Sequence, residues 1–255
     1  MPTPSERAAL APDDLALARS AMWEALALGF RSPTAETVAR LASREGARAL
    51  ADVAAGLDPV ADGDRLAPLA RALAVEPPAT VAGLGLVYDQ LFGHTARGAA
   101  PPYETEYGED SLWAPQREMS DLGGFFRAFA LRLDARARER PDHIACECEF
   151  LLVLARKEAR ALALGDQAMG EATARAARLF LRDHLGRWAP AFGSRLVRLD
   201  SGGFYGALGR LLATFVGAEC ARAGVVAGPG FLRLRSAEPD DTPAACGPVV
   251  AEPGA

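Results

Sequence analysis

Acidic side chains are concentrated in one short stretch of this sequence, between Tyr103 and Asp121. The acids of the stretch are Glu104, Glu106, Glu109, Asp110, Glu118 and Asp121, and its one base is Arg117. Six acids against one base give −5, which equals the net charge of the whole chain, so the remaining residues balance to zero. Beside Tyr103, Tyr107 and Trp113, such a charge suits a basic and partly apolar peptide, because complementary charge steers and orients a partner. A solvated acidic loop is the alternative interpretation.

A second cluster of polar residues, Glu139-Arg-Pro-Asp-His143, directly precedes a helical segment. Pro141 restricts the approach of the chain, Asp142 is predicted to be the N-cap of the helix, and His143 falls in its first turn. A carboxylate in this place could also accept a charge-assisted hydrogen bond from an arginine. By themselves, these residues favour the simpler interpretation of a well-formed helix start.

The same region carries residue types that bind metals, namely His143, Cys146, Glu147, Cys148 and Glu149. At about 100° per helical residue, the two cysteines lie roughly 160° apart and cannot bind one ion together. His143 and Glu147 share a face, but two ligands do not complete a zinc site. The sequence also has no glycine-rich phosphate loop and no nucleophile elbow. We therefore predict no metal, no cofactor and no enzyme activity, and a metalloprotein or hydrolase built on His143 and Glu147 is the less favoured alternative.

The elements that position these residues are expected to be helices. Ala, Leu and Arg dominate, and no stretch alternates apolar and polar residues as a half-buried strand would. Apolar residues spaced by three and four predict a first helix that starts after Asp13 or Asp14 and ends at Phe30. Further helices are expected at 34–55, 64–75, 80–92, 116–134, 142–164, 166–188, 190–199 and 201–223. The predicted fold is an all-α, single compact bundle.

Composition changes near the C-terminus, where Pro, Gly, Ala and acidic residues take over. We place the helical domain at residues 1–228 and expect residues 229–255 to form a disordered tail. Deleting residues 230–255 should then leave stability nearly unchanged. Phe231, Leu232 and Leu234 could instead dock on the bundle.

Several partners and locations are disfavoured by composition. A net charge of −5 argues against nucleic acid, which requires an excess of basic residues on one face. No apolar run approaches the roughly 18 to 20 residues that span a bilayer, so we expect no stable membrane insertion. The N-terminus lacks the features of a secretory signal, and the four cysteines show no disulfide framework. A cytoplasmic location is expected.

Four longer motifs of this sequence resemble the TorD/DmsD/NarJ superfamily of redox-enzyme maturation chaperones. They are Pro101-Pro-Tyr-Glu-Thr-Glu-Tyr-Gly, Asp121-Leu-Gly-Gly-Phe-Phe-Arg-Ala-Phe, Glu139-Arg-Pro-Asp-His-Ile-Ala-Cys-Glu-Cys-Glu-Phe and Phe180-Leu-Arg-Asp-His-Leu-Gly-Arg-Trp. The resemblance extends over about residues 15–224 and looks closest to the branch that serves periplasmic molybdoenzymes of the dimethyl-sulfoxide-reductase type. The sequence departs from the family at Cys146 and Cys148, where larger aliphatic residues are usual.

The resemblance implies a TorD-like all-α fold and a cytoplasmic chaperone. Its partner would be the molybdenum-containing catalytic subunit of a dimethyl-sulfoxide-reductase-type enzyme, bound through a twin-arginine leader before export and helped to receive its molybdenum cofactor. The residues implied to bind the peptide are Tyr103, Glu104, Tyr107, Asp142 and His143, with Trp113, Phe125 and Phe126 as an apolar wall. An assembly factor for a non-exported nitrate-reductase-type subunit is the alternative within the same superfamily.

Overall fold

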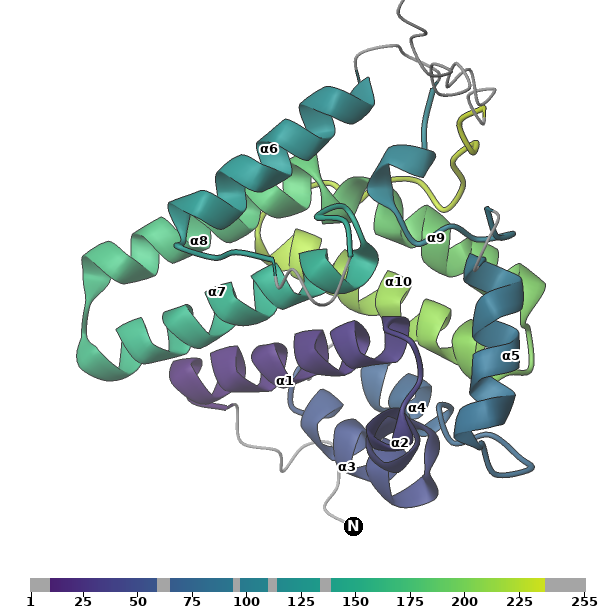
Figure 1. Ribbon diagram of the computed structural model, residues 1–255. Coiled ribbons are helices and arrows are strands. Elements are labelled where there is room, and N and C mark those ends of the chain that lie inside the picture. The colour runs from purple at the N-terminus through teal and green to yellow at the C-terminus, as the bar shows by residue number, and fades with distance from the viewer. Residues whose placement is uncertain (1–9, 59–64, 94–96, 110–113, 134–138, 237–255) are drawn as a thin grey trace, which may run out of the picture.

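The computed structural model describes residues 10–58, 65–93, 97–109, 114–133 and 139–236. Within these ranges the chain forms ten α-helices and no β-strand, which confirms the predicted all-α fold (Figure 1). The long helix α7 (Ile144–Leu164) packs along α1 (Pro12–Phe30) and also contacts α8 (Gln167–Asp183). A second closely packed pair is formed by α9 (Leu185–Leu199) and α10 (Phe204–Arg222).

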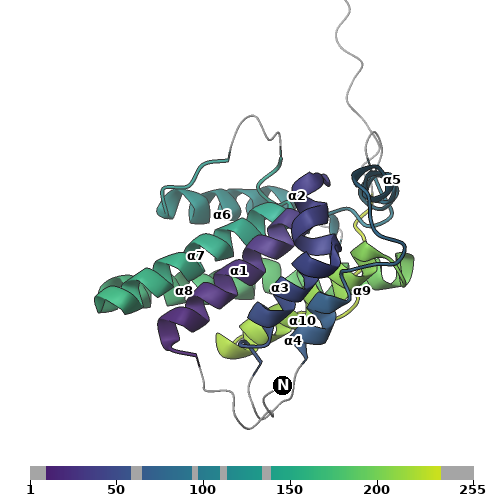
Figure 2. The same ribbon diagram turned by 90° about the horizontal axis from the view of Figure 1, so that it is seen from below.

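The shorter helices cover the edges of this central group. Next to α1 and α10 lie α3 (Arg44–Ala54) and α4 (Leu66–Arg71), as Figure 2 shows. A short α2 (Ala35–Thr37) and a π-helical turn at Val38–Ala42 lead into α3. Helix α5 (Val81–Phe92) stands at one edge, and α6 (Ala114–Ala128) lies across α8 (Figure 1). None of the helices in the described ranges has the length and apolar character that a membrane crossing requires.

Local sequence explains where the first helices begin. Helix α1 starts at Pro12, two or three positions earlier than expected, because proline suits the first helical position and Asp13 and Asp14 favour the first turn of a helix. The single helix expected at 34–55 is divided, since Ser43 leaves the helical conformation and caps α3 by accepting a hydrogen bond from the Gly46 amide at 3.0 Å.

The boundary between α8 and α9 was predicted wrongly. We expected a break before Pro190, but the chain leaves the helical conformation at His184, and Pro190 lies inside α9. A proline inside a helix removes the donor for the carbonyl four residues earlier. That carbonyl belongs to Gly186, and it accepts a hydrogen bond from the Gly228 amide at 2.8 Å. A later segment of the chain therefore compensates for the proline.

Helices α9 and α10 cross at two glycines. A Cβ on Gly209 would lie 2.6 Å from the carbonyl oxygen of Gly193, a distance that real Cβ atoms do not show. The backbones can approach this closely only because both residues lack a side chain. Beside the crossing, Phe192 and Tyr205 each contact Phe92 of α5, so aromatic rings fill the space between these helices.

One buried ion cluster joins the first helix to the last. Arg19 of α1 donates to both carboxylate oxygens of Glu219 of α10, at 2.9 and 3.0 Å, and to Glu158 of α7 at 2.7 Å. Arg222 adds a second guanidinium to Glu219 at 3.0 Å. Burial raises the pKa of Glu219, but Arg19 and Arg222 outweigh it and hold this pKa below its usual value. The cluster therefore stays ionised and connects three helices.

The packed chain extends beyond the predicted boundary at residue 228. Residues 228–236, which we call the C-terminal arm, run over the bundle as an extended segment (yellow in Figure 1). Leu232 and Leu234 of the arm are partly buried against the core. The helical domain therefore includes residues up to 236, and loss of the arm is expected to reduce stability. The part of the expected tail from residue 237 onward lies outside the described residues.

Candidate functional site

Residues 101–109, which we call the acidic segment, are held in place from both sides. On one side, Tyr103 forms an antiparallel bridge with His143, and the Glu104 amide donates to the Asp142 carbonyl at 2.9 Å. On the other side, Tyr107 forms an antiparallel bridge with Leu234 of the arm. The acidic segment therefore lies between the start of α7 and the C-terminal arm, and it is fixed by main-chain hydrogen bonds to both.

Asp142 is buried beneath this segment and does not cap α7. Its side chain is 0% exposed and accepts hydrogen bonds from the Thr105 hydroxyl at 2.7 Å and from the Arg140 guanidinium at 2.7 and 3.0 Å. The N-cap is His143, whose Nδ1 accepts from the Ala145 amide at 3.1 Å. The predicted cap role of Asp142 is wrong, and the arginine that its buried carboxylate binds is Arg140 of this chain. Its observed contacts position the acidic segment instead.

His143 is buried and neutral, whereas Tyr103 above it reaches the surface. The His143 side chain is 1% exposed, and its ring lies 5.2 Å from that of Tyr103. Burial, with help from Arg31 and Arg140, lowers the pKa of His143 to about 3. The guanidinium carbon of Arg140 lies 4.6 Å from the centre of the Tyr103 ring, in a cation–π contact. At this corner, Tyr103 and Arg140 are thus the pair that is partly exposed to solvent.

A chain of three ionisable groups runs from the interior to the surface. Glu104, only 3% exposed, contacts His184 Nδ1 at 2.9 Å, and His184 Nε2 faces Asp121 at 3.3 Å. Burial raises the pKa of Glu104, although His184 opposes the shift. Burial lowers the pKa of His184, but Glu104 and Asp121 outweigh it and raise this pKa above its ordinary value. The imidazole is therefore favoured in its charged form between two carboxylates.

The residues of the metal-site alternative have separate partners. Both carboxylate oxygens of Glu147 accept from the Trp188 indole nitrogen, at 3.2 and 3.3 Å, while His143 faces Ala145 and Glu139. Burial raises the pKa of Glu147 well above its usual range and that of the Cys146 thiol to about 12. Within the described ranges, no group of three His, Cys, Asp or Glu residues is arranged to hold a metal. The described residues around His143 and Glu147 therefore do not form the complete ligand set that a metalloprotein would need.

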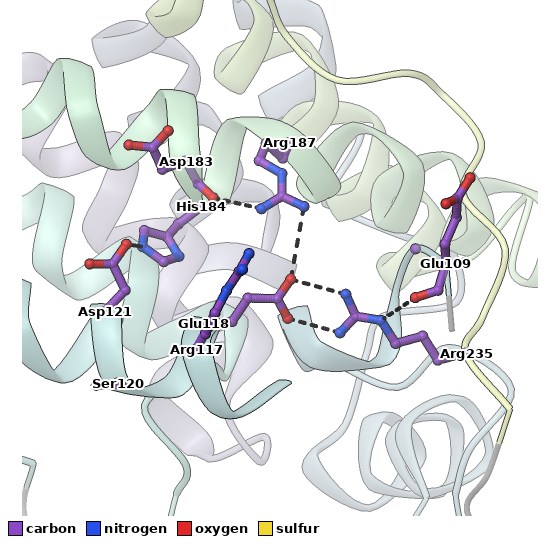
Figure 3. Close-up of a pocket in the computed structure, with 10 residues that line it drawn as sticks. Glu109, Arg117, Glu118, Ser120, Asp121, Asp183, His184, Arg187 and Arg235 are labelled. Atoms are coloured by element: carbon purple, nitrogen blue, oxygen red, sulfur yellow. Dashed lines mark hydrogen bonds and ion pairs between the residues drawn. The ribbon is translucent and has the colours of Figure 1, made fainter. Parts of the chain in front are cut away.

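A cavity of about 820 Å³ opens next to the acidic segment, between α6 and the α8–α9 junction (Figure 3). Its lining residues are Gly108, Glu109, Arg117, Glu118, Ser120, Asp121, Asp183, His184, Arg187 and Arg235. Figure 3 shows the Glu118 carboxylate between two guanidinium groups, Arg187 at 3.8 Å and Arg235 at 2.8 Å. The cavity is therefore lined by both signs of charge.

This arrangement corrects the expected acidic patch. Glu106 pairs with Arg97 at 2.7 Å, and Glu118 pairs with Arg235, which comes from the arm. Asp121 is 63% exposed and keeps most of its carboxylate open to solvent. The excess of −5 counted along the sequence is thus partly neutralised by bases that lie outside the stretch. An open carboxylate is left at Asp121.

The structure separates the predicted binding residues into surface and interior groups. Tyr103 and Phe125 are partly exposed, whereas Glu104, Tyr107, Phe126, Asp142 and His143 are buried. Phe125 packs against Phe180 and His184, at ring distances of 5.3 and 5.5 Å, and Tyr107 packs against Trp188 at 5.2 Å. Trp113 lies outside the described residues. The buried members support the surface that Tyr103 and Phe125 help to form.

Sequence reasoning missed three residues that line the cavity, namely His184, Arg187 and Arg235. The first two lie in the motif at residues 180–188, so a signal was present but was not assigned to the site. Arg235 gave no signal because it falls in the segment that composition assigned to a disordered tail.

Comparison with known proteins agrees with these motifs. A family model described as nitrate reductase delta subunit matches residues 57–194. The chaperone protein TorD of Vibrio cholerae serotype O1 (strain M66-2) is 29% identical over 133 residues, which are 49% of this chain and 56% of that protein. The selenate reductase assembly chaperone protein of Thauera selenatis is 39% identical over 106 residues, 42% of this chain and 53% of that protein.

A third relative, the chlorate reductase assembly chaperone protein of Ideonella dechloratans, is 38% identical over 91 residues, 36% of this chain and 43% of that protein. The chain thus spans about half the length of the curated relatives it matches. These relatives are named as chaperones and not as enzymes, in agreement with the prediction that the chain is not an enzyme. Because the family model covers more than half of the 255 residues, the chain belongs to the nitrate reductase delta subunit family, within the TorD-like superfamily of assembly chaperones.

Proposed function

We propose that this chain is a cytoplasmic assembly chaperone for the molybdenum-containing catalytic subunit of a dimethyl-sulfoxide-reductase-type enzyme. It binds the twin-arginine leader of that subunit before export and assists the insertion of the molybdenum cofactor. Family membership supports the chaperone role, since its relatives are named as the chaperone protein TorD and as selenate and chlorate reductase assembly chaperone proteins. No covalent chemistry is required of the chain.

The observation that carries this proposal is the cavity beside the acidic segment. Asp121 lies at its rim with a largely exposed carboxylate, and a carboxylate of this kind accepts two parallel hydrogen bonds from an arginine. Phe125 is partly exposed and packs against His184 of the cavity, Tyr103 is also partly exposed, and the two rings offer apolar area to the hydrophobic part of a leader. Charge and apolar contact together match a peptide that contains both features.

The test is a calorimetric titration of the full chain with a synthetic twin-arginine leader peptide. Loss of one charged hydrogen bond should weaken binding about tenfold to a hundredfold, so Asp121→Asn is expected to lower the affinity by that factor. Glu171→Gln is the matched control. Glu171 is also an exposed acid, but it lies near the start of α8, whereas the cavity lies at the end of α8. Equal affinity of both variants and the unaltered chain would exclude Asp121 from the peptide site.

A second candidate function is assembly of a non-exported nitrate-reductase-type subunit. The description of the matching family, nitrate reductase delta subunit, favours it. The same titration separates the two candidates when the paired arginines of the peptide are replaced by lysines, which cannot form the planar bidentate contact. Binding that is lost with lysine supports the twin-arginine leader, and binding that is unchanged supports the second candidate.

A further inference from the structure

The C-terminal arm pairs with the acidic segment as an added strand would. The Gly108 amide donates to the Arg233 carbonyl at 2.9 Å, and the Arg235 amide donates to the Glu106 carbonyl at 2.9 Å. Main-chain hydrogen bonds of this kind do not depend on the side chains of the added segment. Any extended peptide could therefore form the same pairing along this edge.

The side chain of Arg235 enters a site with a complete set of acceptors. Its guanidinium donates to both oxygens of Glu118, at 2.8 and 2.9 Å, and to the carbonyls of Thr105 at 2.7 Å and Glu109 at 3.1 Å. The planar fork of arginine matches a carboxylate with two parallel hydrogen bonds, and the ammonium of lysine cannot. The acceptors therefore discriminate in favour of arginine.

Gly108 lies beside this guanidinium. Its φ of 115° lies in the region that favours glycine, and a Cβ there would lie 3.4 Å from Arg235 Nη2. Arg235 is only 9% exposed, whereas Arg233, two residues earlier, is exposed and Leu234 between them packs on the core. The site takes one arginine of an extended chain.

This site is continuous with the cavity described above. Glu118 and Arg235 both line that cavity, and Arg187 approaches the same carboxylate at 3.8 Å. If Arg235 moved out, the Glu118 carboxylate and the main-chain edge at residues 106–108 would face an incoming peptide. The polar environment that now accepts Arg235 would then be available to another arginine.

We infer that Glu118, with the carbonyls of Thr105 and Glu109, forms an arginine-binding slot for an extended peptide, and that Arg235 occupies this slot as a built-in competitor. The identity of the external peptide, a twin-arginine leader, rests on the proposed function. The apparent affinity for the leader is then the intrinsic affinity of the open slot multiplied by the fraction of molecules in which the slot is open. Binding of the partner displaces the arm.

The experiment compares full-length variants in titrations with two peptides. One is the synthetic leader, and the other is the arm peptide GPGFLRLRS, which corresponds to residues 228–236. Arg235→Ala removes the competitor and keeps the slot, so leader affinity should rise by up to about tenfold to a hundredfold, the effect of one charged contact. The arm peptide should bind this variant and not the unaltered chain. Arg233→Ala is the matched control, because it removes an exposed arginine of the same arm, and it should bind the leader as the unaltered chain does.

Glu118→Gln tests the slot itself. This substitution should weaken binding of the leader and abolish binding of the arm peptide. The same losses are expected when it is combined with Arg235→Ala. Melting temperatures of all variants establish that they fold. Arg235→Lys keeps the positive charge but lacks the planar guanidinium, so it should release the arm less completely. The gain in leader affinity should then be intermediate.

The outcomes separate this inference from the proposed function. In one outcome, the arm peptide binds Arg235→Ala but not the double variant Glu118→Gln/Arg235→Ala, and the leader binds none of the proteins. The slot inference is then supported and the proposed function is refuted. If the leader binds all variants equally and the arm peptide binds none, the slot inference is overturned and the proposed function stands. Leader affinity that falls in Arg235→Ala would also overturn it, since the arm would then assist binding.

Discussion

Replacing His143 with asparagine should remove a large part of the acid sensitivity of this protein. His143 is buried and its folded-state pKa is about 3, compared with 6.5 for an unperturbed imidazole. The folded state therefore excludes a proton that the unfolded chain binds. Stability from this group is complete above pH 6.5 and is lost as the pH falls towards 3.

The magnitude follows from the shift in pKa. Each unit corresponds to about 1.4 kcal/mol, so the whole shift is worth roughly 5 kcal/mol, and about 2 kcal/mol of it is lost between pH 7 and pH 5. The charged groups that face the imidazole are Arg31, Arg140 and, 3.9 Å from Nε2, Glu139. The two arginines disfavour the imidazolium, and burial raises the pKa of Glu139, so its carboxylate gives less support to the imidazolium in acid.

The assay is urea unfolding of the unaltered chain and of His143→Asn at pH values from 7 to 5. Asparagine caps a helix about as well as any residue, so α7 keeps its cap while the titration disappears. Any loss of packing lowers stability equally at every pH. The difference between the two curves should therefore shrink by about 2 kcal/mol over this range. A constant difference would refute the assignment of a buried, neutral imidazole.

Two further predictions concern the packing of the bundle. Gly209→Ala should lower the free energy of unfolding by about 1 to 3 kcal/mol, because the new Cβ forces α9 and α10 apart, whereas Gly217→Ala in the same helix has open space and should stabilise by about 0.5 to 1 kcal/mol. Equal effects in thermal melts would contradict the close crossing. Arg19→Ala should cost about 3 to 5 kcal/mol in urea unfolding, because it leaves Glu219 buried next to a single guanidinium, and a loss below about 1 kcal/mol would mean that the cluster is solvated.

The fold was largely predictable from local sequence, and the exceptions have a common cause. Periodicity and caps located α5 and α7 to within a few residues, since the relevant signals lie inside the helices themselves. The break at His184 and the continuous α9 through Pro190 were missed. They depend on partners far away in sequence: Glu104 for His184, and Gly228 for the carbonyl that Pro190 leaves without a donor.

The candidate site shows the same limit more strongly. Sequence located the acidic segment and the cluster at residues 139–143, but it could not tell that Asp142 points inward to Thr105 and Arg140. It also counted the charge of the acidic stretch without Arg97, Arg187 and Arg235, which reach that stretch only in the folded chain. The net charge of a surface therefore cannot be counted from one stretch of sequence, because the tertiary contacts decide which other charged residues join it.

The ion cluster around Arg19 has a consequence for the order in which the chain folds. Arg19 and Glu219 are separated by 200 positions in sequence, so the ribosome releases α1 long before α10 exists. Until then, the guanidinium of Arg19 has Glu158 of α7 as its partner, at an edge that α10 has not yet covered. Helix α1 can thus dock on α7 during synthesis without burying an unpaired charge. Glu219 can complete the cluster only after α10 has been synthesised, because α10 is the last helix of the described residues.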